Sequence, residues 1–272
     1  MKVILSRKGF DSANGGIVSP ILEDGTMISF PIPSPDVHTF SELECNGIPY
    51  DQLLHDLNYK ETRYGVHCHI DPDLNSDRWK LKPAGWFPAF GQISSSASYL
   101  KHIGVAPGDI FLFFGNFHRV AKGPNGSYRY LRHTGDFYRD SDLQVIWGYL
   151  QVGEILSTPE QQKTAPWHPH SIPERTCIPT NVIYKASGHL SFAPAFPGAG
   201  ILPFAKKRVL TLYGASKGTW TKNPVYDKNN ILSNRKNNAK DPRTGIYYAG
   251  IWQELGLKES DACTAWCKNL LL

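Results

Sequence analysis

Two long apolar stretches dominate the pattern of the chain and predict a pair of buried strands. Residues 110–114 are five consecutive apolar side chains, which follow a turn with Pro107 and Gly108 and end at Gly115. Such a run leaves no polar face for solvent, which is typical of a strand that is covered on both sides. Residues 145–156 form a second long strand by the same reasoning, and we expect the two strands to pair.

Shorter apolar stretches predict further strands around this pair. Residues 2–6 indicate a short buried strand, which leads into a glycine turn at Gly15 and Gly16. The Asp24-Gly25 pair between apolar runs predicts a hairpin whose return strand covers residues 27–32. Three prolines, at 31, 33 and 35, should end regular pairing there. Residues 182–185 and 209–213 are both candidate strands, and the second has the stronger pattern.

Three segments have the apolar spacing of helices. The stretch after Pro49 suits a short amphipathic helix, and residues 94–103 contain neither glycine nor proline and end at Gly104. In the tail, residues 259–272 carry apolar side chains at helical spacing, with Ser260 as a candidate N-cap. We therefore expect an α+β fold, a β-rich mixed single domain over residues 1–272 with a C-terminal helix.

Composition supports a folded domain in a reducing compartment. The chain is 41% hydrophobic and 19% charged, which suffices to bury a sizeable core and excludes disorder. No run approaches the length of about 18 apolar residues that spans a bilayer, and the first apolar stretch is too short for a signal peptide. The five cysteines are odd in number and scattered, so we expect reduced thiols and a cytoplasmic location.

The charge balance favours a polyanion as partner without requiring one. The formal net charge is +5 and the pI is about 8.8. The excess is uneven, because residues 223–243 contain five cations against two aspartates: Lys228, Arg235, Lys236, Lys240 and Arg243. That segment could contact phosphate.

The first polar cluster lies where the first strand ends and suits a nucleotide phosphate. Arginine binds phosphate through two hydrogen bonds and lysine through a compact charge, and amides in a glycine turn can add donors. The P-loop and dinucleotide-binding fingerprints are both absent. The alternative is a tight surface turn with solvated charges. The candidate nucleotide-binding residues are Ser6, Arg7, Lys8, Asp11, Gly15 and Gly16.

The second polar cluster combines imidazoles and carboxylates. If residues 66–71 form a strand, alternate side chains share a face, so His67, His69 and Asp71 would point together as ligands for a divalent metal. Asp73 could add a ligand or orient a histidine. These four residues are also candidates for acid-base catalysis. The alternative is a polar surface strand, and the cofactor, if any, is otherwise unknown.

His168 and His170, in a proline-rich loop, could complete a site that distant segments build, or could bond only local backbone. Basic and aromatic residues also alternate in a later stretch, a pattern that suits base stacking beside phosphate contacts as well as an ordinary polar hairpin. That stretch contains Arg119, Lys122, Tyr128, Arg129, Tyr130, Arg132, His133 and Tyr138.

Several short motifs, taken together, resemble one family. They are S-R-K-G-F-D-S at 6–12 with Gly15-Gly16 and Ser19-Pro20, H-x-D-P-D-L at 69–74, Gly91-Gln92, G-D-I-F-L-F-F-G at 108–115, I-W-G-Y-L at 146–150 and His168-Pro169-His170. The chain resembles the nucleotide modification-associated domain 3 family over most of its length. Family members carry a Gly-Gln-Glu-Phe-like segment before the last helix, of which this chain keeps only Gln253 and Glu254.

The resemblance implies a bacterial or phage protein linked to DNA base modification or to phage defence, with a nucleotide or DNA as partner and other proteins of a modification system beside it. It does not name a reaction. A weaker likeness, of 107–114 and 146–154, is to the small barrels of the pseudouridine synthase and archaeosine transglycosylase group. This second likeness implies a small base-binding β barrel within the domain, by fold analogy alone.

Three functions fit these observations. The first is a nucleotide- or DNA-base-modifying enzyme, with phosphate near Arg7 and Lys8 and chemistry at the His67 to Asp73 segment. The second is a non-catalytic reader of modified bases that uses Trp147, Tyr149 and the basic-aromatic stretch. The third is a structural partner in a modification complex. A single site requires that the two polar clusters meet in space.

Overall fold

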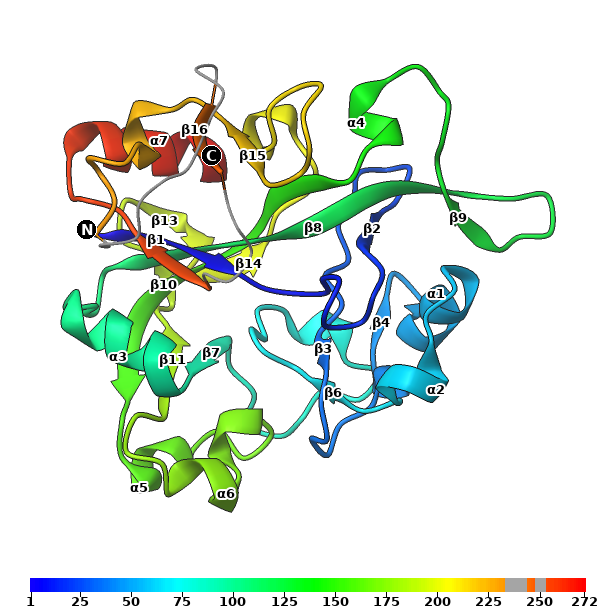
Figure 1. Ribbon diagram of the computed structural model, residues 1–272. Coiled ribbons are helices and arrows are strands. Elements are labelled where there is room, and N and C mark those ends of the chain that lie inside the picture. The colour runs from blue at the N-terminus through cyan, green and yellow to red at the C-terminus, as the bar shows by residue number, and fades with distance from the viewer. Residues whose placement is uncertain (233–243, 248–252) are drawn as a thin grey trace.

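A mixed β-sheet forms the centre of the molecule (Figure 1). The computed structural model describes residues 1–232, 244–247 and 253–272, with the backbone alone for 244–247. The main strand order is β17 (Glu254–Gly256), β1 (Val3–Arg7), β8 (Ile110–Lys122), β10 (Leu143–Leu156), β11 (Val182–Ala186) and β7 (Ala89–Gln92). Three more strands join its two longest members: β2 (Ser19–Ile21) and β9 (Tyr128–Tyr130) pair with β8, and β14 (Ala199–Ile201) pairs with β10.

The two strands predicted from the apolar runs do pair. β8 runs antiparallel to β10, with an irregular register between Ile146 and Gly148, and parallel to β1. Side chains of residues 110, 112 and 114 enter one apolar cluster and those of 111 and 113 enter another. Because successive side chains in a strand point to opposite faces, this division confirms that both faces of the sheet are covered.

Two of the predicted helices, α3 (Ser94–His102) and α7 (Asp261–Leu271), pack on opposite faces of the sheet. α7 packs over the cluster that contains Val3 and Leu5, and Ser260 caps it by accepting a hydrogen bond from the amide of Cys263. α3 contributes Leu100 to the opposite cluster. Both predicted helices are therefore confirmed, as is the α+β class.

A third apolar cluster lies beside the sheet and holds the segment between β2 and β7. It packs around Phe10, Phe40 and Trp167. Its elements are β3 (Ile32–Pro33), η1 (Phe40–Glu42), β4 (Glu44–Cys45), β5 (Ile48–Pro49), α1 (Tyr50–Asp56), α2 (Glu61–Tyr64), β6 (Cys68–His69) and η2 (Ser76–Arg78). α1 confirms the helix predicted after Pro49.

The remaining elements are short. They are α4 (Phe137–Asp140), α5 (Pro159–Gln162), η3 (Pro169–Ser171), α6 (Pro173–Thr176), β12 (His189–Leu190), β13 (Ala193–Pro197), η4 (Lys206–Arg208), β15 (Thr219–Thr221), η5 (Pro224–Tyr226) and β16 (Thr244–Tyr247).

Two predicted strands are wrong. Residues 27–32 pair only through a bridge from Met27 to Ile21 and through β3 at their end. Residues 209–213 bridge Val145 at Val209 and Trp220 at Thr211. The chain there crosses from one partner to the other, so no strand forms, whereas residues 182–185 belong to the internal strand β11.

Further expectations from the sequence concerned a small barrel, reduced cysteines, membrane spans and the basic segment 223–243. In the part of the chain that the structure describes, the strand pairings do not close the sheet, so the expected small barrel is not confirmed. All five cysteines are outside disulfides. Among the described helices, none has the length and apolarity to cross a bilayer. Most of the basic segment 223–243, including Arg235, Lys236, Lys240 and Arg243, lies outside the described residues.

Candidate functional site

The two polar clusters meet at one pocket of about 320 Å³. The turn after β1 forms one side and the segment after β6 the other, with the end of β7 and the loop before α6 between them. Its lining comprises Arg7, Lys8, Gly9, Asp11, Asn14, Ile32, Pro33, Ser34, Pro35, His69, Asp71, Gly91, Gln92, Ile93, His170, Arg175 and Gln253. The volume is within the range of small-molecule sites.

Two cations from the turn reach this pocket, each beside a carboxylate. Arg7 Nη2 lies 3.3 Å from Asp11 Oδ2, and Lys8 Nζ lies 3.5 Å from Glu254 Oε1 and 4.5 Å from the centre of the Phe90 ring. The Glu254 side chain is almost fully buried, and burial raises the pKa of its carboxyl against the attraction of Lys8.

Much of the glycine turn uses its backbone amides internally. The amides of Ala13 and Asn14 donate to Asp11 Oδ1, and those of Asp11 and Gly16 bond within the turn. Gly15 has a φ of +93° and lies against the ring of Phe10, where a Cβ would be 2.3 Å from a ring carbon. These four amides are occupied by the turn itself, so they are not available to a phosphate.

Ser6, Gly15 and Gly16 are not among the lining residues. The buried Ser6 hydroxyl donates to Glu254 Oε1 beneath the pocket. The predicted nucleotide-binding set is therefore divided, with Arg7, Lys8 and Asp11 at the pocket and the other three supporting the turn or the strand.

His69 is held by a buried carboxylate. Its Nδ1 lies 2.6 Å from Asp36 Oδ2, while Arg175 Nη1 lies 2.7 Å from Asp36 Oδ1 and the Ser34 hydroxyl also donates to this carboxylate. Burial alone would raise the pKa of Asp36, but the hydrogen bonds from His69 and Arg175 outweigh it and hold this pKa far below its usual range. Asp36 is thus ionised, and it fixes the orientation of the His69 ring.

Asp71 lies opposite the other nitrogen of that ring. Asp71 Oδ2 is 3.8 Å from His69 Nε2, and Asp71 Oδ1 accepts a 2.6 Å hydrogen bond from the amide of Gly91. The buried Nε2 of His168 is 3.2 Å from the same Oδ1. Burial opposes ionisation of Asp71, yet the contact with His168 and the positive charge of Lys8 keep its pKa well below the usual range.

His170 completes this group from the η3 turn. Its Nδ1 lies 2.6 Å from Asn181 Oδ1, and the Asn181 amide group donates to Gln162 Oε1 and to the His170 carbonyl, both at 2.8 Å. Because the Asn181 nitrogen is used twice, its oxygen accepts, and His170 Nδ1 carries the proton. Burial lowers the pKa of His170 to about 3, so the ring is neutral near pH 7.

His69, Asp71 and His170 together could hold a metal ion, because one ligand atom from each lies within 4.8 Å of the others. His67 does not belong to this group and is exposed. The expected alternation fails because β6 ends at His69 and the amide of Asp71 turns back to the His69 carbonyl. His170, from the loop that the sequence suggested as an additional element, takes the place expected for His67.

Asp73 points away from the pocket into an indole-lined interior. Its Oδ2 accepts hydrogen bonds from Trp79 Nε1 at 2.9 Å and from Trp86 Nε1 at 2.6 Å, and its side chain is fully buried. It is not among the pocket's lining residues. These contacts favour a structural role over the predicted catalytic one.

Sequence reasoning missed the residues that orient the site. Asp36 and Asn181, from loops, and Arg175, from α6, contact its side chains without belonging to a recognisable motif. Gln92 bonds Glu254 behind Lys8. Of the residues around the pocket that were not predicted, only Gln92, Gln253 and Glu254 could have been found from the sequence, because they belong to motifs of the family resemblance. Gln253 lines the pocket and Glu254 pairs with Lys8, although no role was expected for that tail.

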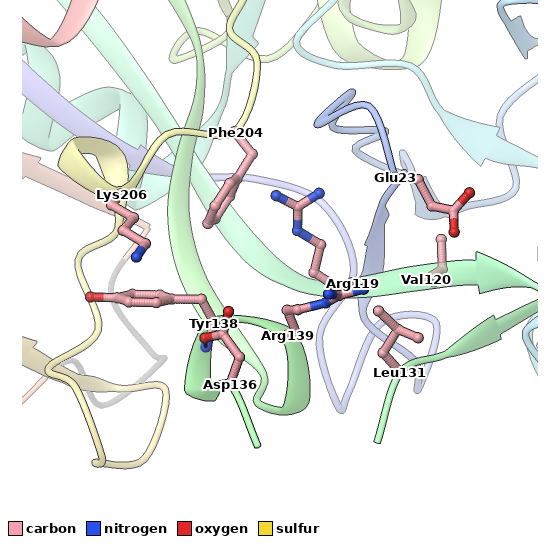
Figure 2. Close-up of a pocket in the computed structure, with 9 residues that line it drawn as sticks. All are labelled: Glu23, Arg119, Val120, Leu131, Asp136, Tyr138, Arg139, Phe204 and Lys206. Carbon is pink, nitrogen blue, oxygen red and sulfur yellow. Dashed lines mark hydrogen bonds between the residues drawn. The ribbon is translucent and has the colours of Figure 1, made fainter. Parts of the chain in front are cut away.

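A second pocket, of about 290 Å³, gathers part of the basic-aromatic stretch. Figure 2 shows Arg119, Arg139 and Lys206 around it with Tyr138 and Phe204. The Arg119 guanidinium lies 4.5 Å from the Phe204 ring centre and Lys206 Nζ lies 4.9 Å from that of Tyr138. Glu23 and Asp136 line it too, so its cations exceed its carboxylates by one.

Two of the aromatic residues expected to bind a modified base, Trp147 and Tyr149, are buried. Trp147 is 2% and Tyr149 is 5% exposed, and both pack in the apolar clusters of the sheet. Tyr130 is tied to the Val18 carbonyl by its hydroxyl. The predicted reader pocket around Trp147 and Tyr149 is therefore absent from the described residues.

Comparison with known proteins gives one family. The model of the family described as nucleotide modification associated domain 3 matches residues 2–257. No curated protein and no solved structure matches the chain. The match includes every residue of the pocket just described. The chain therefore belongs to the nucleotide modification associated domain 3 family, whose name implies a role in nucleotide modification.

Proposed function

We propose that the chain is an enzyme that binds a nucleotide, or a nucleotide unit of DNA, in the pocket between Arg7 and His170 and modifies its base. The single observation that supports this most is the convergence of phosphate-suited cations and a buried His-Asp-His group on one pocket of nucleotide size. Family membership supports the substrate class.

The phosphate would lie at the cationic side of the pocket. Arg7, Lys8 and Arg175 are each already beside a carboxylate, which holds their side chains in place without removing all their donors. Arginine has five N–H donors, so a guanidinium can keep its carboxylate and still bind a phosphate oxygen. The apolar and amide groups of Ile32, Pro33 and Gln92 would then contact the sugar or base.

The reacting group would lie at the opposite side, near His69. The Asp36 carboxylate accepts the proton of His69 Nδ1, so Nε2 is the ring nitrogen that faces Asp71 and the pocket. An imidazole oriented in this way accepts and donates protons near neutral pH. This arrangement favours an enzyme over a reader, since the described residues that line the pocket include no Phe, Tyr or Trp on which a base could stack.

The binding half of the proposal is tested by calorimetric titration with a panel of nucleoside mono- and triphosphates. Arg7→Gln should weaken binding by about 10- to 100-fold, because a hydrogen bond to a charged group contributes about 1.5–3 kcal/mol. Lys101→Gln removes an exposed cation at the end of α3 and should bind like the parent chain. Equal binding by both variants, or no binding by the parent, would sink the proposal.

The catalytic half is tested by the mass of the nucleotide or DNA after incubation with the protein. A mass change in the base that is lost in His69→Gln, while nucleotide binding persists, would support an enzyme. Binding without any mass change would instead support the non-catalytic reader.

We further propose DNA, in a DNA modification or phage-defence setting, as the physiological substrate. The second pocket supports binding of a polynucleotide. Its cations Arg119 and Lys206 lie over aromatic rings, and they suit contacts with phosphates or bases of nucleotides other than the one bound in the first pocket. Single-stranded and duplex oligonucleotides should bind more tightly than a mononucleotide, and the difference should shrink as salt rises. Equal affinity for mono- and oligonucleotides would limit the substrate to a free nucleotide.

A further inference from the structure

The side chains of His69, Asp71 and His170 have the chemistry and the spacing of a three-ligand metal centre. Two imidazole nitrogens and one carboxylate oxygen lie within 4.8 Å of one another. Ligands at about 2.1 Å from a tetrahedral ion lie about 3.4 Å apart, so the most distant pair has to close by at most about 1.4 Å, a movement that the three side chains would share. Such a donor set suits first-row transition ions rather than Mg²⁺ or Ca²⁺, which prefer oxygen ligands.

Both imidazoles are already oriented as metal ligands. His69 Nδ1 is engaged by Asp36 and His170 Nδ1 by Asn181, each at 2.6 Å. In each ring Nε2 is therefore left as the nitrogen that can bind an ion. Histidine ligands nearly always bond a carboxylate, carbonyl or similar group through the second nitrogen, because that bond sets the tautomer and the ring plane.

Asp71 is the carboxylate of this pocket that has no lysine or arginine of the described residues in direct contact, although the charge of Lys8 acts on it from a distance. Asp11, Glu254 and Asp36 lie beside Arg7, Lys8 and Arg175, whereas the ion-pair partners of Asp71 in the described structure are His69 and His168. A buried carboxylate is costly unless a cation in direct contact compensates its charge. A divalent ion between His69, Asp71 and His170 would supply that charge.

His168 gives an independent indication. Its Nδ1 accepts from the amide of His170, so in the neutral ring the proton is on Nε2. That Nε2 is fully buried, lies 3.2 Å from Asp71 Oδ1 and has no well-aligned hydrogen-bond partner. The ring is aimed at the carboxylate, and a small rotation of Asp71 toward an ion would bring the two into hydrogen-bond geometry.

We infer that His69, Asp71 and His170 bind one divalent first-row transition-metal ion, with Asp36, Asn181 and His168 as the residues that orient the three ligands. The open side of the ion would face the cations Arg7 and Lys8 across the pocket. Three protein ligands with an open position are typical of catalytic rather than structural centres. This inference rests on the proposed function only for what the ion does, namely to polarise a bound nucleotide or activate a water.

The test is titration of chelator-treated protein with Co²⁺, followed by its visible absorption, and then competition with Zn²⁺. One ion per chain should bind. Asp71→Asn and His69→Gln should each lower the affinity more than about 100-fold, because loss of a mere orienting partner already costs about 10- to 100-fold. Circular dichroism checks that both variants fold, and Asp71→Asn retains an oxygen for the Gly91 amide.

His67→Gln is the matched control, since it removes an exposed imidazole two residues from His69 and should bind Co²⁺ like the parent. Absence of stoichiometric binding by the folded parent, or equal losses in His67→Gln and His69→Gln, would overturn the inference. Nucleotide titration of the metal-free chain separates the two proposals. An ion without nucleotide binding would remove the proposed function alone, and nucleotide binding without an ion would remove this inference alone.

Discussion

Replacing Gly91 by alanine should disrupt the site through a single added carbon. The new Cβ would lie 2.3 Å from Cδ2 and 2.5 Å from Cγ of the His170 ring, whereas carbon atoms in contact are about 3.5–4.0 Å apart. The ring would have to move by more than about 1 Å, which would break its 2.6 Å hydrogen bond to Asn181. The backbone of Gly91 is not in the left-handed region, so this collision is the main cost.

The magnitude follows from three contributions. Overpacking of a filled interior costs about 1–3 kcal/mol, and loss of a buried hydrogen bond adds about 1 kcal/mol. The lower entropy of the unfolded alanine chain offsets about 0.5 kcal/mol. The free energy of unfolding should therefore fall by about 1.5–3.5 kcal/mol, which for a chain of this size lowers Tm by roughly 3–14 °C.

Thermal unfolding by circular dichroism measures this effect, with Gly188→Ala as control. No atom lies within 4 Å of the Cβ position at Gly188, and its backbone is likewise outside the left-handed region. We expect Gly188→Ala to unfold within about 1 °C of the parent and to bind Co²⁺ normally, while Gly91→Ala loses both stability and Co²⁺ affinity. Matching melting curves for the two variants would refute the packing argument.

Three further predictions concern stability outside the proposed metal ligands. Asp73→Ala should cost about 2–4 kcal/mol by leaving two buried indole N–H groups unpaired, while Asp73→Asn keeps the acceptor and should melt much nearer the parent; equal melting would contradict the structural role. Burial opposes ionisation of Asp142, but His118 and Lys217 lower its pKa, so its stabilising effect is present above about pH 4 and lost as pH falls through the folded value. A plot of Tm against pH should thus be flatter below about pH 4 in Asp142→Asn, and an unchanged plot would refute this. Ser260→Ala should lower the free energy of unfolding by about 1 kcal/mol in a denaturant titration, because the amide of Cys263 loses its cap.

Local patterns predicted the parts of the fold that depend on local physics. The run at 110–114 is buried on both faces, the helices at α3 and α7 lie where their spacing placed them, and Ser260 is the cap. The same patterns failed at 209–213, where alternation is right for a strand but the chain has no continuous partner. Pairing depends on what lies alongside, and a single segment carries no information about that.

The sequence by itself determined which side chains carry chemistry: the cations after β1, the His69-x-Asp71 pair and the histidines near 170. Only the tertiary structure decided that these segments share one pocket, that His170 rather than His67 completes the group, and that Asp36 and Asn181 hold its rings. The physical reason is the separation along the chain over which each kind of interaction acts. Turn chemistry and strand periodicity act between near neighbours, whereas a site assembled from residues 36, 71, 170 and 181 exists only after the sheet and its flanking cluster have packed.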